Sequence, residues 1–251
     1  MSTLVQEQFG RNAEGYLTSK PHAQGKSLDR LIALTRPQRD WRVLDVATGG
    51  GHVAYAFAPH VARVWATDIT DEMIALVRSE ASKRGLANLR TGFAKAEALS
   101  FDDASFDLVT CRIAPHHFES IPAFVREVHR VLKPGALFGL VDNVVVPGSV
   151  GEFVNAFERF RDPSHLRAWT MQEWRDALTT AGFAIAHEEE LDKIMEFKPW
   201  AARHNADVQA FLRAMLAHAD PDVRASLDPQ GSGDALTFRL REGLFIGRKG
   251  A

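Results

Sequence analysis

Short β-branched segments alternate with amphipathic segments through the middle of the chain, and this alternation restricts the possible folds more than any other feature. Apolar residues recur at helical spacing in the intervening segments, for example over residues 121–132. Strands that alternate with helices form βαβ units, which cross over right-handed and build a parallel sheet covered on both faces. The first five predicted strands are residues 41–46, 62–67, 89–93, 106–111 and 136–146.

The pattern changes after Pro147. Residues 183–190 and 235–246 are the last two predicted strands, and we expect them to pair antiparallel at one edge of the sheet. Residues 199–227 carry helical patterns and form a predicted helical insertion before the last strand. The predicted fold is therefore α/β: a Rossmann-like, doubly wound sheet of seven strands, mostly parallel, with an antiparallel last strand.

The length of 251 residues fits one large α/β domain. We assign residues 41–251 to this domain and expect residues 147–170 and 199–227 to form a helical cap. Residues 1–40 precede the first strand and carry helical patterning. We expect them to form an N-terminal helical flap against the edge of the sheet that binds ligands.

Composition excludes several classes of protein. The net charge of −2, from 30 Lys and Arg against 32 Asp and Glu, provides no basic field for nucleic acid. The single cysteine, Cys111, rules out an intrachain disulfide and a thiolate metal cluster and suits a reducing compartment. We find no signal peptide and no apolar stretch of the ~20 residues that a membrane span needs. We therefore expect a cytoplasmic protein with a small-molecule partner, in an oligomeric state that the sequence leaves open.

Three glycines, Gly49, Gly50 and Gly51, lie where the first predicted strand meets a helix. Glycine lets the backbone turn tightly and approach a ligand closely, and the first helical turn presents free N–H groups. Asp45 lies near the end of that strand, and Asp68 ends the next one. Ligands of open α/β sheets bind at the carboxyl ends of the strands, so these features predict one shared crevice.

Two cofactors are compatible with this crevice. The pattern Gly49-x-Gly51-x-x-Ala54, with Asp68 near the required offset of ~20 residues, fits the dinucleotide fingerprint, so an NAD(P)-dependent oxidoreductase is one interpretation. The carboxylate of Asp45 argues against it, because a carboxylate repels a pyrophosphate and attracts a sulfonium or an amino group. S-adenosylmethionine (SAM) carries both of these cations and no phosphate.

Four segments follow one another in the order of a known family. Residues 43–54 (VLDVATGGGHVA) resemble the class I methyltransferase motif of a strand, an acidic residue and G-x-G-x-G, with Ala47 in place of the first glycine. The others are ATDITDEMI (66–74), AEALSFDDASFDLV (96–109) and REVHRVLKPGALFGLVDN (126–143). Over residues 41–145 the chain thus resembles a class I SAM-dependent methyltransferase of the methyltransferase-11 group, in the branch similar to ubiquinone/menaquinone C-methyltransferases.

The resemblance implies methyl transfer from SAM to an O, N or C nucleophile of a small molecule, with S-adenosylhomocysteine as product. It also implies cofactor contacts at Asp45, Ala47, Gly49, Gly51, Asp68, Ile69, Ala96, Glu97 and Arg112. Asp68 would bind the ribose hydroxyls and Ile69 the adenine. Lys95 stands where relatives carry an acidic residue, so adenine recognition there would use backbone or Glu97, or would be weaker. Ala47 is tolerable at a glycine position only if its φ is negative. A non-catalytic SAM-binding protein is a further alternative.

Candidates for the chemistry follow the fourth and fifth strands. His116 and His117 lie beside the expected methyl donor, where either could act as a base or shape the pocket. Asp142 and Asn143 resemble two metal ligands of catechol-type O-methyltransferases, but the acidic ligand needed after the fourth strand is missing, so we expect a wall of the substrate pocket and no metal. The opening residues FGRNAEGYL resemble the N-terminal flap of the same branch, which makes Tyr16 a third candidate substrate contact.

Overall fold

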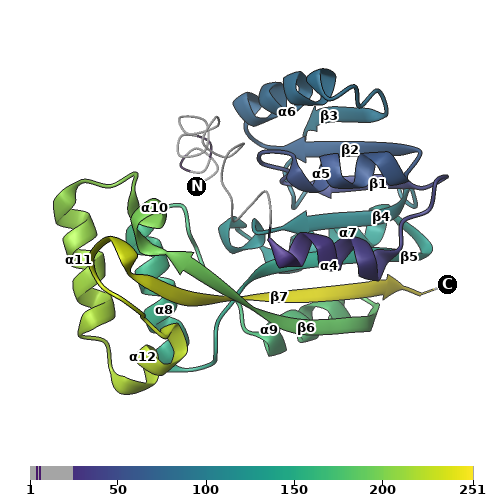
Figure 1. The fold of residues 1–251 in the computed structure, drawn as a ribbon. Coiled ribbons are helices and arrows are strands. Elements are labelled where there is room, and N and C mark those ends of the chain that lie inside the picture. Colours follow the sequence, from purple (N-terminus) through teal and green to yellow (C-terminus); the bar gives the residue numbers. More distant parts are fainter. Residues whose placement is uncertain (1–3, 5, 7–24, 251) are drawn as a thin grey trace.

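The computed structural model describes residues 4, 6 and 25–250. Its strands form one seven-stranded sheet in the order β3-β2-β1-β4-β5-β7-β6 (Figure 1). The strands are β1 (Arg42–Val46), β2 (Arg63–Asp68), β3 (Leu89–Phe93), β4 (Phe106–Arg112), β5 (Leu132–Val144), β6 (Phe183–Glu196) and β7 (Thr237–Lys249). Strands β1 to β5 pair in parallel, whereas β7 runs antiparallel to both β5 and β6. The predicted Rossmann-like sheet is confirmed.

Helices cover both faces of the sheet. One face packs against α4 (Lys26–Thr35), α5 (His52–Phe57) and α6 (Asp71–Lys83), and the other against α7 (Ile121–Val131) and α9 (Met171–Thr180). Helix α4 lies directly on β5 and β7, so close that a Cβ added at Gly139 would be 2.6 Å from Leu31 Cδ1. Of residues 1–40, the structure describes 25–40 continuously, and a flap role for the whole segment stays a prediction.

A second lobe lies beyond one end of the sheet, where β6 and β7 continue as a pair (Figure 1). Three helices occupy the connection between these strands: α10 (Phe197–Ala201), α11 (Ala206–Ala217) and α12 (Pro221–Leu227). Together with α8 (Ser149–Arg161) they enclose a separate apolar core. At its centre the ring of Phe157 stacks on Trp200 at 4.8 Å, and Phe238 meets Trp200 edge-on at 4.9 Å. We call these four helices and their core the cap.

Two strand boundaries differ from the sequence-based expectation by four residues or more. Strand β5 begins at Leu132, directly after α7, and thus includes Lys133, Pro134 and Gly135, which precede the predicted start at residue 136. The positive φ of Gly135 (+75°) and a register shift against β4 let the chain enter the strand early. Strand β6 extends to Glu196, beyond the expected 190, because its pairing with β7 continues into the cap.

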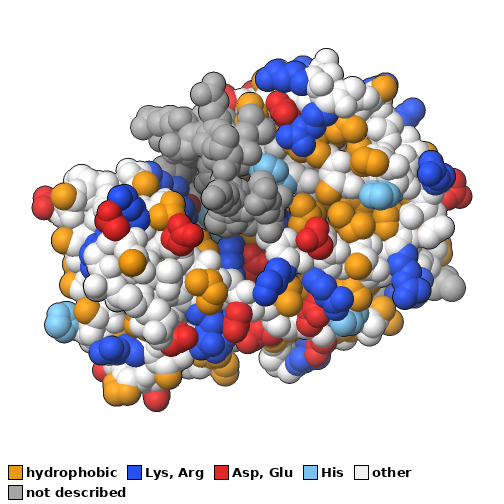
Figure 2. Space-filling model, viewed as in Figure 1, with side chains coloured by type: hydrophobic (Ala, Val, Ile, Leu, Met, Phe, Trp, Pro, Cys, Tyr) orange, Lys and Arg blue, Asp and Glu red, His pale blue; other side chains and the backbone are white. Residues whose placement is uncertain are grey.

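On the face of the molecule drawn in Figure 2, side chains of Lys and Arg are interspersed with those of Asp and Glu. Among the residues that the structure describes, no helix combines the length and the apolar character needed to cross a bilayer.

Candidate active site

The loop from β1 to α5 forms one wall of a cavity at the carboxyl ends of the strands. Gly49 and Gly51 have φ values of +51° and +82°, which favour glycine. Ala47 also has a positive φ, +52°, so the expectation of a negative φ was wrong. The loop is fixed by its own hydrogen bonds: Thr48 N donates to Thr67 O at 2.8 Å, and Gly49 N donates to Asp68 Oδ2 at 2.9 Å. These bonds hold the backbone of Ala47 in a left-handed conformation that costs roughly 1–2 kcal/mol.

Asp45 lies beneath this loop and is almost fully buried. Its carboxylate accepts hydrogen bonds from Thr48 Oγ1 at 2.6 Å and Thr110 Oγ1 at 2.8 Å. Burial raises the pKa of Asp45 to about 6, against the opposing effect of these two hydroxyls. Asp45 and Gly51 are not among the residues that line the cavity. A direct contact of either residue with the cofactor therefore stays a prediction, and the bonds seen for Asp45 are those of a residue that holds the loop.

Gly51 has a structural requirement of its own. It precedes α5, and a Cβ built on it would lie 2.5 Å from Cζ of Tyr55, whose ring packs beneath the loop. By contrast, a Cβ at Gly49 meets no atom within 4 Å. The space above Gly49 is open, as a cradle for the polar end of a cofactor requires.

Asp68 ends β2 and lines the same cavity. Each carboxylate oxygen accepts one backbone hydrogen bond, Oδ2 from Gly49 and Oδ1 from Thr70. Burial raises the pKa of Asp68, and the backbone N–H groups counteract this shift. A carboxylate oxygen has room for more than one donor, so the ribose hydroxyls can share these oxygens. Ile69 also lines the cavity, and its carbonyl accepts a hydrogen bond from Gln6 Nε2 at 2.7 Å.

The segment after β3 forms the wall where the adenine is expected. Ala96 and Glu97 line the cavity, together with Lys95. Glu97 Oε1 accepts a hydrogen bond from the backbone N–H of Glu119 at 2.9 Å, and Lys95 Nζ forms an ion pair with the carboxylate of Glu119 at 2.8 Å. Lys95 and Glu97 thus both connect this segment to the start of α7, which closes this side of the site.

The end of β4 brings Arg112 and Ile113 to the cavity. Arg112 is buried, which lowers its pKa, and its Nε donates to Ser27 Oγ at 3.1 Å. Ile113 has a φ of +54°. A positive φ is a genuine outlier for a β-branched residue, and such strain concentrates at functional sites. The hydrogen bond from Ile113 N to Val141 O, 2.8 Å long, holds this conformation.

His116 and Asp142 form a buried pair. His116 Nδ1 lies 2.6 Å from Asp142 Oδ1, and the exposed fractions of the two residues are 6% and 1%. Burial lowers the pKa of His116, but the charge and hydrogen bond of Asp142 outweigh it, so the net pKa is raised. His116 and Asn143 line the cavity, whereas Asp142 does not. A contact of Asp142 with the substrate stays a prediction, and the partner that the structure gives its carboxylate is His116.

His117 has different surroundings from its neighbour. Its Nδ1 donates to the carbonyl of Ser164 at 2.9 Å, so the neutral ring carries its proton on Nδ1. Burial, together with the nearby charge of His116, lowers the pKa of His117 to about 3. The ring centroids of the two histidines are 4.2 Å apart. A ring that binds protons this weakly is a poor general base, although it can accept a hydrogen bond.

Sequence reasoning missed most of the cavity residues that follow β5. They are Glu158, Arg161, Asp162 and His165 on and after α8, Lys193 and Met195 on β6, and Leu240 on β7. Their positions carry no motif, so only the expectation that residues 147–170 and 199–227 form a cap pointed toward this wall, to which Trp200 also belongs. His165 packs 5.2 Å from the ring of His116, and burial lowers its pKa to about 2.

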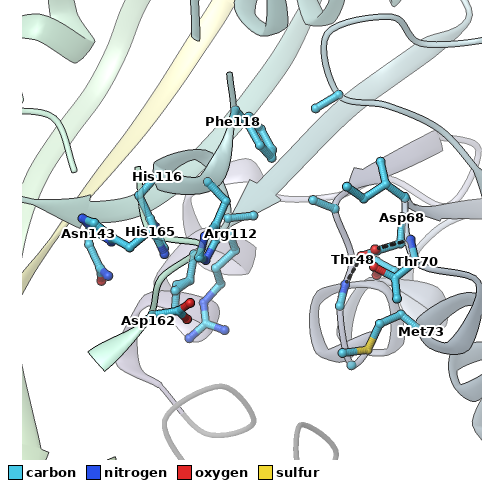
Figure 3. Close-up of a pocket in the computed structure, with 18 of the residues that line it drawn as sticks. Thr48, Asp68, Thr70, Met73, Arg112, His116, Phe118, Asn143, Asp162 and His165 are labelled. Atoms are coloured by element: carbon cyan, nitrogen blue, oxygen red, sulfur yellow. Dashed lines mark hydrogen bonds between the residues drawn. The ribbon is translucent and has the colours of Figure 1, made fainter. Parts of the chain in front are cut away.

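The lining residues divide into two groups. Figure 3 shows Thr48, Asp68, Thr70 and Met73 on one side and Asn143, His116, His165 and Asp162 on the other. The first side carries the glycine loop and the ribose-binding candidate, and the second carries the histidines. Tyr16 lies outside the described residues. Over residues 25–250, no group of three or more His, Cys, Asp or Glu side chains is arranged to hold a metal ion.

This sheet order, with a glycine loop after β1 and an acidic residue at the end of β2, defines a Rossmann-like methyltransferase. Comparisons with known proteins give the same class. The family described as a methyltransferase domain (methyltransferase-11) matches residues 44–140. The chain is 35% identical over 96% of its length to the "uncharacterized methyltransferase YcgJ" of Bacillus subtilis, covering 97% of that protein.

Solved structures agree with this match. The crystal structure of YcgJ superposes with a TM-score of 0.85 at 34% identity, over 90% of this chain and 98% of that one. A putative methyltransferase from Bacillus halodurans gives a TM-score of 0.86 at 33% identity, with 90% and 100% coverage. A ubiquinone/menaquinone biosynthesis C-methyltransferase (UbiE) from Brucella anthropi is 39% identical over 44% of each chain.

The chain belongs to the class I SAM-dependent methyltransferases, in the methyltransferase-11 group, and its cofactor is SAM. The similarity to YcgJ spans nearly the whole chain, including the cap, whereas the similarity to UbiE covers less than half of it. The dinucleotide interpretation of the glycine loop is therefore not supported.

Proposed function

We propose that this enzyme methylates a small molecule at an atom activated by loss of an O–H or N–H proton, and that His116 removes this proton. The observation that carries the proposal is the 2.6 Å contact between His116 Nδ1 and Asp142 Oδ1 at the wall of the cavity. An acceptor that loses its proton becomes a stronger nucleophile, whether the methyl group then reaches O, N or a conjugated carbon.

The cofactor side of the site would bind SAM through the residues assigned above. Ala47, Gly49, Asp68, Ile69, Ala96, Glu97 and Arg112 all line the cavity, and the open space over Gly49 fits the polar end of the cofactor. Bound SAM supplies an electrophilic methyl group on a sulfonium. The protein aligns the acceptor with this group and excludes water, an effect worth up to ~7–11 kcal/mol.

The pairing of His116 with Asp142, called the dyad below, determines which nitrogen of His116 acts as the base. Because Nδ1–H donates to the carboxylate of Asp142, the lone pair on Nε2 is the base. The carboxylate also stabilises the imidazolium that forms when the proton arrives, which is the role of the acid in a histidine–carboxylate pair. Asp142 acts through His116 and is a positioning residue. His117, with its lowered pKa, is left to shape the pocket and to accept a hydrogen bond from the substrate.

Cofactor binding is tested first. Thermal unfolding and calorimetry with SAM, S-adenosylhomocysteine and NADH should show binding of the first two ligands only. Methyl release is then followed over a panel of phenols and amines. Turnover separates an enzyme from a non-catalytic SAM-binding protein, and complete inactivity across a broad metabolite panel would favour the latter.

The dyad is tested by pH profile. A protonated ring cannot act as a base, so kcat should fall on the acid side of its pH profile. Because the pKa of His116 is raised, the midpoint of this fall should lie above 6.5, the ordinary pKa of a histidine. His116→Asn should lower kcat about 10²- to 10⁴-fold with little change in S-adenosylhomocysteine affinity. Asp142→Asn should move the acid limb to lower pH, because the carboxylate no longer favours the protonated ring. Equal losses of kcat and cofactor affinity in both variants would contradict the proposal.

A further inference from the structure

One buried carboxylate in the cavity has an unused acceptor atom. Glu158, on α8, is 7% exposed and lines the cavity on the side of His116 and Asp162. Its Oε1 has no hydrogen-bond partner among the described residues. Burying an acceptor without a donor costs free energy, and such an atom in a native site needs a reason.

A second unused acceptor belongs to the same cavity. Asn143 lines it at the end of β5, and Asn143 Oδ1 also lacks a partner among residues 25–250. Neither atom belongs to the His116–Asp142 pair, which uses Nδ1 and Oδ1. The acceptor side of the site thus offers two oxygen atoms in addition to the base.

The cations near Glu158 have partners of their own. Lys193 Nζ pairs with Glu242 at 3.0 Å, and Arg161 Nη1 lies 3.6 Å from Asp162 and packs over the ring of Trp200. Burial raises the pKa of Glu158, and the charges of Arg161 and Lys193 oppose this rise. Neither cation forms a hydrogen bond with Oε1, so a neutral donor on the substrate suffices to satisfy this atom.

The remaining wall near Glu158 is apolar. Met195, Trp200 and Leu240 line it, from β6, α10 and β7. Trp200 is held by its stacking on Phe157, so its indole is a fixed surface. A flat ring packs well against an apolar wall that includes a thioether. These contacts favour an aromatic body for the substrate.

We infer that Glu158 is a specificity-determining residue, which selects aromatic acceptors that carry a second hydroxyl or amino group besides the one deprotonated at His116. This inference rests on the proposed function, since it takes the cavity beside the histidines as the acceptor pocket. The second group donates to Glu158 Oε1, with Asn143 Oδ1 available beside it. A site built to bond such a donor discriminates strongly against the analogue without it, because the analogue leaves a buried oxygen unpaired.

Binding to the protein saturated with S-adenosylhomocysteine tests this inference without turnover. Calorimetry is run with phenol, the three dihydroxybenzenes and the three aminophenols. At least one two-donor ring should bind the wild type about tenfold or more tightly than phenol, as expected for a hydrogen bond to a buried carboxylate. Glu158→Leu should reduce this preference to less than about threefold, and Glu158→Gln should retain part of it because its amide oxygen still accepts.

Glu152→Gln is the matched control, since Glu152 is an exposed residue on the same helix, and it should keep the wild-type preference. A wild type that binds phenol as well as every two-donor ring overturns the inference, as does an unchanged preference in Glu158→Leu. Thermal unfolding with and without S-adenosylhomocysteine checks that each variant is folded. If the wild type does not bind S-adenosylhomocysteine at all, the proposed function fails instead, so the two failures are distinguishable.

Discussion

Two residues at the cavity, Ala47 and Ile113, adopt a left-handed backbone that glycine would adopt more easily. Both are held by backbone hydrogen bonds of their own segments to neighbouring strands. The sequence shows that Ala47 replaces a glycine of the family motif, but not which way the backbone turns. That depends on contacts with β2, which are far away in the sequence. Local sequence therefore predicted the glycine loop and missed its strain.

The strain at Ala47 gives a prediction. Ala47→Gly should stabilise the fold by about 0.5–1 kcal/mol, because glycine removes the cost of the positive φ and this gain exceeds its entropy cost. Denaturant unfolding measures the change. Destabilisation by a similar amount would show that the contacts of the methyl group matter more than the backbone strain.

Gly51 should respond in the opposite way. Gly51→Ala adds a methyl group at φ +82° and against the ring of Tyr55. This substitution should lower the free energy of unfolding by about 2–3 kcal/mol, and it should also weaken the binding of S-adenosylhomocysteine. Gly85→Ala is the control, because Gly85 also has a positive φ (+68°) but open space around it. Its cost should stay near 1 kcal/mol without any effect on cofactor binding. Equal losses in the two variants would contradict a role for Tyr55.

At the scale of elements, periodicity predicted the strands and helices well wherever one face is buried. Strand β3 has the predicted bounds Leu89–Phe93, and α7 ends one residue before the predicted end. The cap was harder to predict, because its helices pack on one another rather than on the sheet. Phe157, Trp200 and Phe238 meet from α8, α10 and β7, and no local pattern encodes that meeting.

The cap depends on a buried ion pair for its internal connection. Asp162, directly after α8, pairs with Arg203 Nη2 at 3.0 Å and accepts from Ser164 N at 3.0 Å. Asp162→Ala should cost about 3 kcal/mol, because a half-buried guanidinium loses its carboxylate. Asp234→Ala, which removes the exposed pair with Lys198, should leave the unfolding transition unchanged. Comparable shifts in the two variants would exclude the proposed difference between buried and exposed pairs.

At the scale of the whole molecule, the sequence predicted the parallel part of the sheet and the cofactor because both depend on residues within 41–145. The acceptor pocket joins residues from β4, β5, α8 and β6, which are brought together only by the topology. His165 and Glu158 therefore had no signal in the sequence. The pairing of His116 with Asp142, 26 positions apart, was also hidden, although each residue was a candidate by itself.

Buried histidines should make the stability of the molecule depend on pH. The pKa of His165 in the folded protein is about 2, below its ordinary value of 6.5. Between these two pH values His165 is protonated in the unfolded chain and neutral in the folded chain. The stability it contributes is present above pH 6.5 and is lost as the pH falls toward 2. When the pH is lowered from 6.5 to 5, the free energy of unfolding of His165→Asn should therefore fall by about 1–2 kcal/mol less than that of the wild type.

Denaturant unfolding at several pH values measures this difference, and His60→Asn serves as the control at an exposed position. If the free energy of unfolding depends on pH in the same way for His165→Asn and the wild type, His165 takes up its proton in the folded protein as well.

Strand β6 runs from the sheet into the cap and β7 returns from the cap to the sheet, and they pair with each other from Phe183–Lys249 to Glu196–Thr237. The two lobes are thus joined by a pair of hydrogen-bonded strands, with one register shift between Ile185 and His187, rather than by a linker. Paired strands resist bending, so they keep the distance between the glycine loop and the cap wall constant. Replacing α10–α12 can then change the acceptor specificity of the enzyme. The alignment of the acceptor with the methyl group would stay the same.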